Sequence, residues 1–210
     1  MNGPDTLFVG DDSPTLAEIA KSQAVCVETA KSYGGGVLVV SGIVITCLHF
    51  IRNQGEICVN GKPAKLIHTN KAQDLAALCI DQDAPWVKFC LTPRLEEVVV
   101  FTAPIRIKKQ FRLVTSPEGR ITYVAPDVLC ASMLTELGSC GSGLWSQQGL
   151  LGLVASDENL GFTQAVPSRI LQRFAVQSYR ILHNLQKSKG EANNQRELPF
   201  VQRQGQLPWQ

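Results

Sequence analysis

The chain has 210 residues, of which 44% are hydrophobic and 18% are charged. This composition excludes a largely disordered chain and allows one large all-β domain or two small coupled barrels. The net charge is +2, from 20 Lys and Arg against 18 Asp and Glu, so the overall charge neither favours nor excludes a nucleic-acid partner.

The first predicted elements are a leader and a short helix within residues 1–23. The leader lacks a basic region followed by an apolar core, so we expect no signal peptide. Ser13-Pro14-Thr15 is typical of a helix start, and apolar residues follow it at helical spacing. The longest apolar run, Gly36 to Leu48, is too short to span a membrane and suits a buried strand pair, so we predict no membrane segment.

Two sets of short strands rich in β-branched residues follow, separated by turn signals such as Gly34-Gly35-Gly36 and Asn60-Gly61. The first set, in residues 24–103, is predicted at 25–27, 36–46, 56–59, 64–68, 75–80 and 98–101. The second set, in residues 110–167, is predicted at 111–115, 120–124, 128–132, 143–146, 150–155 and 161–166. This pattern predicts an all-β fold of two antiparallel β-barrels with a boundary near residues 103–109.

The last predicted element is a C-terminal helix over residues 168–187. Pro167-Ser168 is a helix start, and residues such as Phe174 and Leu182 form an apolar stripe. After Lys187 the composition changes to Lys, Gly, Glu, Asn, Gln and Pro. We therefore expect residues 188–210 to be a disordered tail.

Seven cysteines occur, and an odd number leaves at least one thiol free. Most lie in apolar strand-like runs, and no Cys-x-x-Cys pair is present, so we predict reduced thiols packed as small hydrophobic residues and no metal site. Free thiols indicate a reducing compartment, so we expect a cytoplasmic protein.

One segment, residues 136–145, crowds small residues around a single thiol, that of Cys140. Glycines at 138, 141 and 143 allow the backbone to turn sharply and to direct its N–H groups toward one point. A tight turn of this kind builds an oxyanion hole around a nucleophile. The alternative is a glycine-rich turn that holds a cysteine with no catalytic role.

A catalytic thiol needs a base, and the chain has three histidines: His49, His68 and His183. His183 falls in the final helix and His68 at a strand end, whereas His49 ends a strongly apolar strand. Such a histidine is more often structural than catalytic, but Asp74 and then Cys140 follow it in the chain. Asp74 opens an apolar strand, where it would orient an imidazole at a barrel rim. Two rival acids lie at the far end of that strand: Asp81 and Asp83.

Four segments together resemble the chymotrypsin-like proteases. Gly35-Gly36-Val37-Leu38 with Ile45-Thr46-Cys47-Leu48-His49 looks like the strand pair that carries the catalytic histidine, and Asp74-Leu75-Ala76 looks like the acid segment. Gly138-Ser139-Cys140-Gly141-Ser142-Gly143 looks like the nucleophile loop, and residues 149–166 look like the hairpin that walls the specificity pocket.

Within that superfamily, Gly-x-Cys-Gly resembles the viral 3C-like, picornavirus-type main proteases. Cys58-Val59-Asn60-Gly61-Lys62 and Phe162-Thr163-Gln164-Ala165 agree with that resemblance. It implies two six-stranded barrels with short terminal helices and a cysteine endopeptidase that cleaves a viral polyprotein, and possible host proteins, in the host-cell cytoplasm. Its substrate would be a polypeptide, and it would need neither a metal nor an organic cofactor.

The same resemblance implies a role for each site residue. Cys140 would be the nucleophile, His49 the general base and Asp74 the group that orients it. The backbone N–H groups of Gly138 and Cys140 would form the oxyanion hole. Two side chains would face the P1 residue of the substrate: Val154 and Thr163.

The chain departs from the viral pattern in its specificity pocket. Val154 stands where glutamine-cleaving members place a histidine, so the pocket lacks a donor for a glutamine amide. We therefore expect a small or apolar P1 residue to be preferred over Gln, and Lys and Arg to be poor because no carboxylate is evident.

Two other functions are compatible with the sequence. A cellular trypsin-like serine protease would use Ser142, although the motif register places Cys140 at the nucleophile position. An inactive two-barrel binding module would retain the fold alone. RNA is a further partner that the sequence allows, because four basic residues gather near the connector: Arg106, Lys108, Lys109 and Arg112. The competing interpretation of these charges is a protected edge strand.

Overall fold

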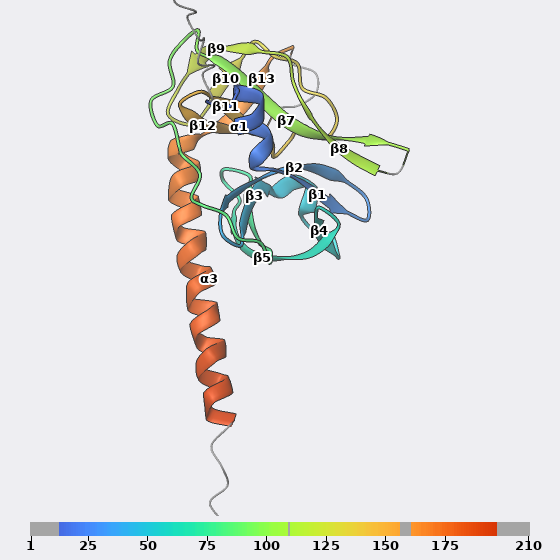
Figure 1. Ribbon diagram of the computed structural model, residues 1–210, viewed down its shortest axis with the longest axis vertical. Helices are drawn as coiled ribbons and strands as arrows, with labels where there is room; N and C mark the ends of the chain where they lie inside the picture. The colour runs from blue at the N-terminus through green and yellow to red at the C-terminus, as the bar shows by residue number, and fades with distance from the viewer. Residues whose placement is uncertain (1–12, 109, 156–160, 197–210) are drawn as a thin grey trace, which may run out of the picture.

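The computed structural model describes residues 13–108, 110–155 and 161–196, and within them two β-barrels lie one above the other with a long helix along one side (Figure 1). The first barrel is built from β1 (Ala24–Thr29), β2 (Tyr33–Val40), β3 (Ile43–Cys47), β4 (Ile57–Val59), β5 (Lys62–Asn70) and β6 (Leu75–Cys79). These strands close in the order β1-β2-β3-β6-β5-β4, and each neighbouring pair is antiparallel. The predicted hairpin at Asn60-Gly61 joins β4 to β5.

The second barrel contains β7 (Val98–Ile107), β9 (Gly119–Val124), β10 (Leu129–Ala131), β11 (Gly143–Ser146), β12 (Gly149–Val154) and β13 (Thr163–Pro167). Its strands follow the order β11-β12-β13-β10-β9-β7, and a β11–β7 pairing closes the circle. A further strand, β8 (Gln110–Thr115), pairs with the end of β7, and the two form a hairpin that projects from the barrel (Figure 1). The predicted all-β fold of two six-stranded barrels is therefore confirmed.

The boundary between the barrels differs from the predicted one. Residues 98–101 were expected to belong to the first barrel, but β7 pairs with β9 and β11 of the second. The first barrel ends at Cys79, and residues 80–97 run across to the second barrel with no strand of their own. Pro85 and Pro93 lie in this connector, where proline removes a backbone donor and so disfavours strand pairing.

Two short helices occur in the N-terminal part of the chain, one before β1 and one after β3. In α1 (Leu16–Ser22), the Thr15 hydroxyl accepts a hydrogen bond from the Glu18 N–H, and the Glu18 carboxylate bonds back to Thr15, which forms a capping box. This helix packs on β7 and β11. The single turn α2 (Leu48–Ile51) follows β3 directly.

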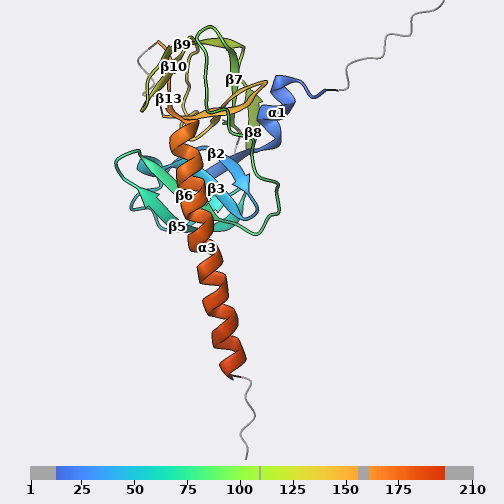
Figure 2. The same ribbon diagram turned by 90° about the vertical axis from the view of Figure 1, so that its left-hand side faces the viewer.

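The final helix, α3 (Ser168–Arg196), is longer than predicted. It contacts β3, β5 and β6 of the first barrel and β12 and β13 of the second, and then extends beyond both (Figures 1 and 2). Residues 188–196, expected to belong to a disordered tail, continue the helix, and residues 197–210 lie outside the described residues. The extension contains Lys, Glu, Ala, Gln and Arg, all strong helix formers, which carry the helix past Gly190.

The largest buried cluster lies between the two barrels. It combines residues of the first barrel, such as Ile45, with Trp145 and Leu153 of the second and with Phe174 of α3. This shared core fixes the position of one barrel against the other. Within the described residues no helix is both long and apolar enough to cross a membrane. All seven cysteines are free thiols.

Candidate active site

His49 and Asp74 meet because of the pairing between β3 and β6. Cys47, the last residue of β3, is the partner of Leu75 in β6, so the residues just beyond these strand ends lie at the same rim of the barrel. The Leu48 N–H donates to the backbone carbonyl of Asp74 at 2.9 Å, and the His49 N–H donates to Asp74 Oδ1 at 2.8 Å. Asp74 has a φ of 54°, a left-handed conformation that aspartate tolerates better than most residues.

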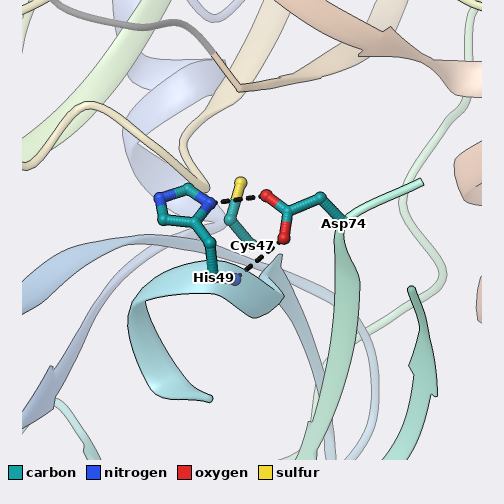
Figure 3. Close-up of side chains that lie close together, drawn as sticks. All are labelled: Cys47, His49 and Asp74. Atoms are coloured by element: carbon teal, nitrogen blue, oxygen red, sulfur yellow. Dashed lines mark hydrogen bonds and ion pairs between the residues drawn. The ribbon is translucent and has the colours of Figure 1, made fainter. Parts of the chain in front are cut away.

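The second Asp74 oxygen, Oδ2, lies 2.5 Å from His49 Nδ1 (Figure 3). This hydrogen bond, followed by one to the side chain of Cys140, raises the pKa of His49 from 6.5 to about 10, although partial burial opposes the shift. The His49 side chain is 50% exposed and that of Asp74 is 37% exposed. Both are therefore accessible at the surface while their geometry is fixed by the backbone.

Cys140 lies on the tight loop between β10 and β11. Gly138 and Gly141 have φ values of 94° and 85°, in the left-handed region that glycine alone adopts without cost. The loop is fixed by two backbone hydrogen bonds of 2.8 Å, in which Gly141 donates to Val154 in β12 and Gly35 in β2 donates to Cys140. The loop is thus bonded to both barrels, and its thiol faces the histidine rim.

The structure brings together the three residues that the sequence predicted as a catalytic set. Cys140 is hydrogen-bonded to the His49 side chain, and His49 is hydrogen-bonded to Asp74. They come from the loop before β11, from α2 and from the residue before β6, so two residues of one barrel face a thiol of the other. A thiol, an imidazole and a carboxylate in this order can carry out nucleophilic acyl transfer.

The predicted oxyanion donors, the N–H groups of Gly138 and Cys140, lie in this same loop. The loop is held closely at Gly138, where a Cβ atom would come within 2.6 Å of the Tyr33 ring and 2.8 Å of the Pro104 carbonyl oxygen. Tyr33 in turn packs on Phe111 of β8, with ring centroids 5.0 Å apart. No local pattern marks Tyr33 as part of the site, because its contact with the loop depends on how the barrels pack.

Ser142, the alternative nucleophile, is fully buried between the barrels. A Cβ atom built on Gly35 would lie 2.2 Å from Ser142 Oγ, so the hydroxyl is directed at the backbone of β2. Among the described residues, this oxygen has no hydrogen-bond partner. The side chain is therefore remote from solvent and from any incoming peptide.

The two residues expected to face the P1 side chain, Val154 and Thr163, are also fully buried. Val154 belongs to the hydrophobic core of the second barrel, and the Thr163 hydroxyl donates to the Met133 carbonyl at 3.0 Å. Neither side chain is exposed to a ligand in this conformation. As substrate-binding residues they stay a prediction.

The Cys47 side chain is seen between His49 and Asp74 in the close-up view (Figure 3). Its thiol is completely buried and donates to the Val154 carbonyl oxygen at 3.4 Å. Burial, with the neighbouring Cys140 and Asp74, raises the pKa of the Cys47 thiol well above its usual value. The sequence offered Cys47 only as a small hydrophobic residue of a strand, and its nearness to Asp74 appears only in the fold.

The rival residues lie elsewhere. His68 Nδ1 is 3.0 Å from the Ser178 hydroxyl, and its ring stacks on Phe174, so it belongs to the contact between β5 and α3. His183 packs on Tyr179 along α3. The predicted basic cluster falls on the β7–β8 hairpin, where Arg106 lies over the Phe111 ring, and its member Lys109 is outside the described residues. RNA binding by this hairpin stays a prediction.

Comparisons with known proteins agree with the fold. No family model and no curated protein sequence matches the chain. Among solved structures, the crystal structure of the serine endoprotease from Yersinia pestis has a TM-score of 0.67 and 24% sequence identity, over 80% of this chain and 68% of that chain. At this identity the likeness establishes the chymotrypsin-like two-barrel fold and assigns no role to individual residues.

Proposed function

We propose that the chain is an endopeptidase that hydrolyses peptide bonds with Cys140 as its nucleophile. The observation that carries this proposal is the hydrogen-bonded series from Cys140 through His49 to Asp74, at the junction of two chymotrypsin-like barrels. Nδ1 of His49 faces Asp74, so Nε2 is the ring nitrogen left to exchange a proton with the thiol.

The reaction follows from this geometry. As the sulfur of Cys140 attacks the scissile carbonyl carbon, His49 takes the thiol proton and then delivers it to the leaving amine. Water next attacks the acyl-enzyme with His49 again as base. Asp74 fixes the ring and favours the imidazolium form, which stabilises a neighbouring thiolate, in keeping with the raised pKa of His49. The N–H groups of Gly138 and Cys140 would bind the oxyanion.

The substrate proposal is a polypeptide with a small or apolar P1 residue. Both predicted pocket residues, Val154 and Thr163, are buried in the second barrel, and the Thr163 hydroxyl already donates to Met133, so neither supplies a donor to a glutamine amide. An unpaired buried amide costs about 1–3 kcal/mol, which corresponds to roughly tenfold or more in preference. Profiling cleavage across all P1 residue types tests this, and a strict preference for Gln would contradict it.

Different observations favour a serine and a cysteine nucleophile. The structural neighbour is a serine endoprotease, which agrees better with the alternative of a cellular serine protease than with a viral cysteine protease. The burial of Ser142 and the hydrogen bond between Cys140 and His49 nevertheless favour a cysteine nucleophile on that fold. Viral polyprotein processing and a cytoplasmic location rest on sequence motifs alone and stay predictions.

A trapping experiment tests the nucleophile. The chain is treated with a peptidyl electrophile that reacts with both thiols and activated serines, and the adduct is located by mass spectrometry. We expect one adduct on Cys140 that is absent from Cys140→Ala, with parallel loss of peptide cleavage. An adduct on Ser142 would favour the serine alternative, and neither adduct nor cleavage would favour an inactive binding module.

A further inference from the structure

Three side chains at the rim of the first barrel bring together the donor atoms of a metal site. The Cys47 sulfur, a ring nitrogen of His49 and a carboxylate oxygen of Asp74 all lie within 4.8 Å of one another (Figure 3). They come from the end of β3, from α2 and from the residue before β6. Hydrogen bonds from the backbone N–H groups of Leu48 and His49 to the Asp74 carbonyl and carboxylate oxygens hold these segments together. Thiolate, imidazole and carboxylate are the ligands that Zn²⁺ takes in proteins.

The dimensions suit a tetrahedral ion. Zinc bonds are about 2.3 Å to sulfur and about 2.0–2.2 Å to nitrogen and oxygen, so ligand atoms around one ion are separated by roughly 3–4 Å. His49 Nδ1 and Asp74 Oδ2 are now 2.5 Å apart and would separate slightly as zinc replaces the proton between them. The Asp74 Oδ1 oxygen keeps its hydrogen bond from the His49 N–H, which supports the carboxylate from the second coordination shell.

An ion has a route to this position from one side. His49 and Asp74 are partly exposed, whereas Cys47 is closed off behind them and bonded only weakly to the Val154 carbonyl. Zinc would enter past the imidazole and the carboxylate and displace the thiol proton of Cys47. The fourth coordination position would face outward and be filled by water, the pattern of an open zinc site.

We propose that Cys47, His49 and Asp74 form an inhibitory zinc site that shuts down the catalytic centre reversibly. Zinc on Nδ1 leaves the ring proton on Nε2, so the imidazole can no longer accept the proton of Cys140. The inhibition rests on the proposed peptidase function, whereas zinc binding itself does not. Zinc could also bind directly to the nucleophilic thiolate of Cys140. The proposed site differs from that case, because its thiolate ligand is Cys47 and zinc binding does not require Cys140.

The test measures metal binding on the full chain, apart from catalysis. Zn²⁺ is titrated against a chromophoric chelator in a phosphine reductant that keeps all thiols reduced, and Co²⁺ replaces zinc to reveal a thiolate-to-metal charge-transfer band. We expect one ion per chain and a thiolate band in Cys140→Ala. Cys47→Ala should lose the band and bind zinc about a hundredfold more weakly or worse, since even outer-shell partners are worth roughly 10–100-fold.

Cys26→Ala is the matched control, because Cys26 is another buried thiol of the first barrel with a raised pKa, about 12, and lies outside the rim. It should bind zinc as the unmodified chain does. Unchanged zinc affinity in Cys47→Ala, or a Cys140→Ala variant without a thiolate band, would overturn the proposal. The second outcome is decisive even where Cys47→Ala fails to fold. For each variant that cleaves peptide, the rate with zinc is compared with the zinc-free rate of the same variant. The binding measurement does not need peptidase activity, so it tests the zinc site even in an inactive chain.

Discussion

Replacing Ser142 by alanine separates the two nucleophile assignments in one experiment. The Ser142 hydroxyl is fully buried and has no hydrogen-bond partner among the described residues. A buried polar group left unpaired costs about 1–3 kcal/mol, and alanine removes the hydroxyl while keeping the Cβ atom. Because the oxygen also packs on Gly35, we expect the lower end of that range. The free energy of unfolding should rise by about 1 kcal/mol, and the melting temperature by about 2–4 °C.

A neighbouring serine provides the control. Ser139 is also buried, but its hydroxyl accepts a hydrogen bond from the Glu136 N–H at 2.9 Å. Ser139→Ala should therefore lower the free energy of unfolding by about 0.5–1.5 kcal/mol, the opposite sign for the same chemical change. Denaturant unfolding curves of the two variants and the unmodified chain give both values, provided that the slopes agree.

The same two variants are then assayed for peptide cleavage and for labelling by a peptidyl electrophile. Ser142→Ala should retain both, because its hydroxyl does not face the substrate side. A folded Ser142→Ala protein that has lost cleavage and labelling would refute Cys140 as the nucleophile. Destabilisation as large as that of Ser139→Ala would instead show that the Ser142 hydroxyl has a partner, and the energetic argument would fail.

Three further predictions follow from other contacts. Asp74→Asn should slow acylation by about 10²–10⁴-fold in rapid-mixing kinetics, because an amide N–H facing His49 favours the wrong imidazole tautomer, and an unchanged rate would exclude the orienting role. Gly35→Ala should cost about 1–3 kcal/mol in unfolding, because its Cβ would lie 2.7 Å from the Ser142 nitrogen; a neutral effect would mean that the barrels separate easily. Burial lowers the pKa of His68 in the folded state, so its contribution to stability is complete above the unfolded pKa of about 6.5 and is lost as the pH falls from that value through the lowered folded pKa. Between about pH 8 and pH 5, the free energy of unfolding of the unmodified chain should therefore fall more steeply than that of His68→Gln. Parallel pH dependences of the two proteins would contradict this reasoning.

Local sequence patterns predicted most of the strands because each barrel strand carries its own signal. β3 and β12 are buried along their whole length and appear as continuous apolar runs, and Asn60-Gly61 marks a tight hairpin. The helix start at Thr15 was likewise local, because a capping box needs only residues three apart. Such features need no knowledge of the tertiary contacts.

The sequence-based predictions were wrong where tertiary contacts determine the structure. Val98 and Val99 read as a strand in either barrel, and only their pairing with Arg120 and Gly119 assigns them to the second. The end of α3 was placed at Lys187 because its apolar stripe ends near there. Composition then suggested disorder, but residues that cannot form a core can still continue an existing helix, since propagation costs little once the helix is nucleated.

The catalytic residues could be predicted from their order in the chain, because that order can be recognised without knowing how far apart the residues lie in the fold. Their surroundings did not, because Cys47 and Tyr33 approach the site only through strand register and barrel packing. The burial of Val154 and Thr163 likewise follows from the core of the second barrel and has no signature in a single strand.

Gly34-Gly35-Gly36 illustrates how one pattern can mean two things. The run was interpreted as a turn, but all three glycines lie inside β2, where the nucleophile loop packs against them. Cβ atoms at Gly34 and Gly35 would collide with the loop backbone, at 2.8 Å from the Cys140 carbonyl oxygen and 2.7 Å from the Ser142 nitrogen. Because these side chains are absent, Gly35 can donate its N–H to Cys140 across the junction. The position of the Cys140 thiol relative to His49 is therefore set by close backbone contact between the barrels. A run of glycines inside a strand can thus indicate a site that is assembled from two domains, and need not indicate a turn.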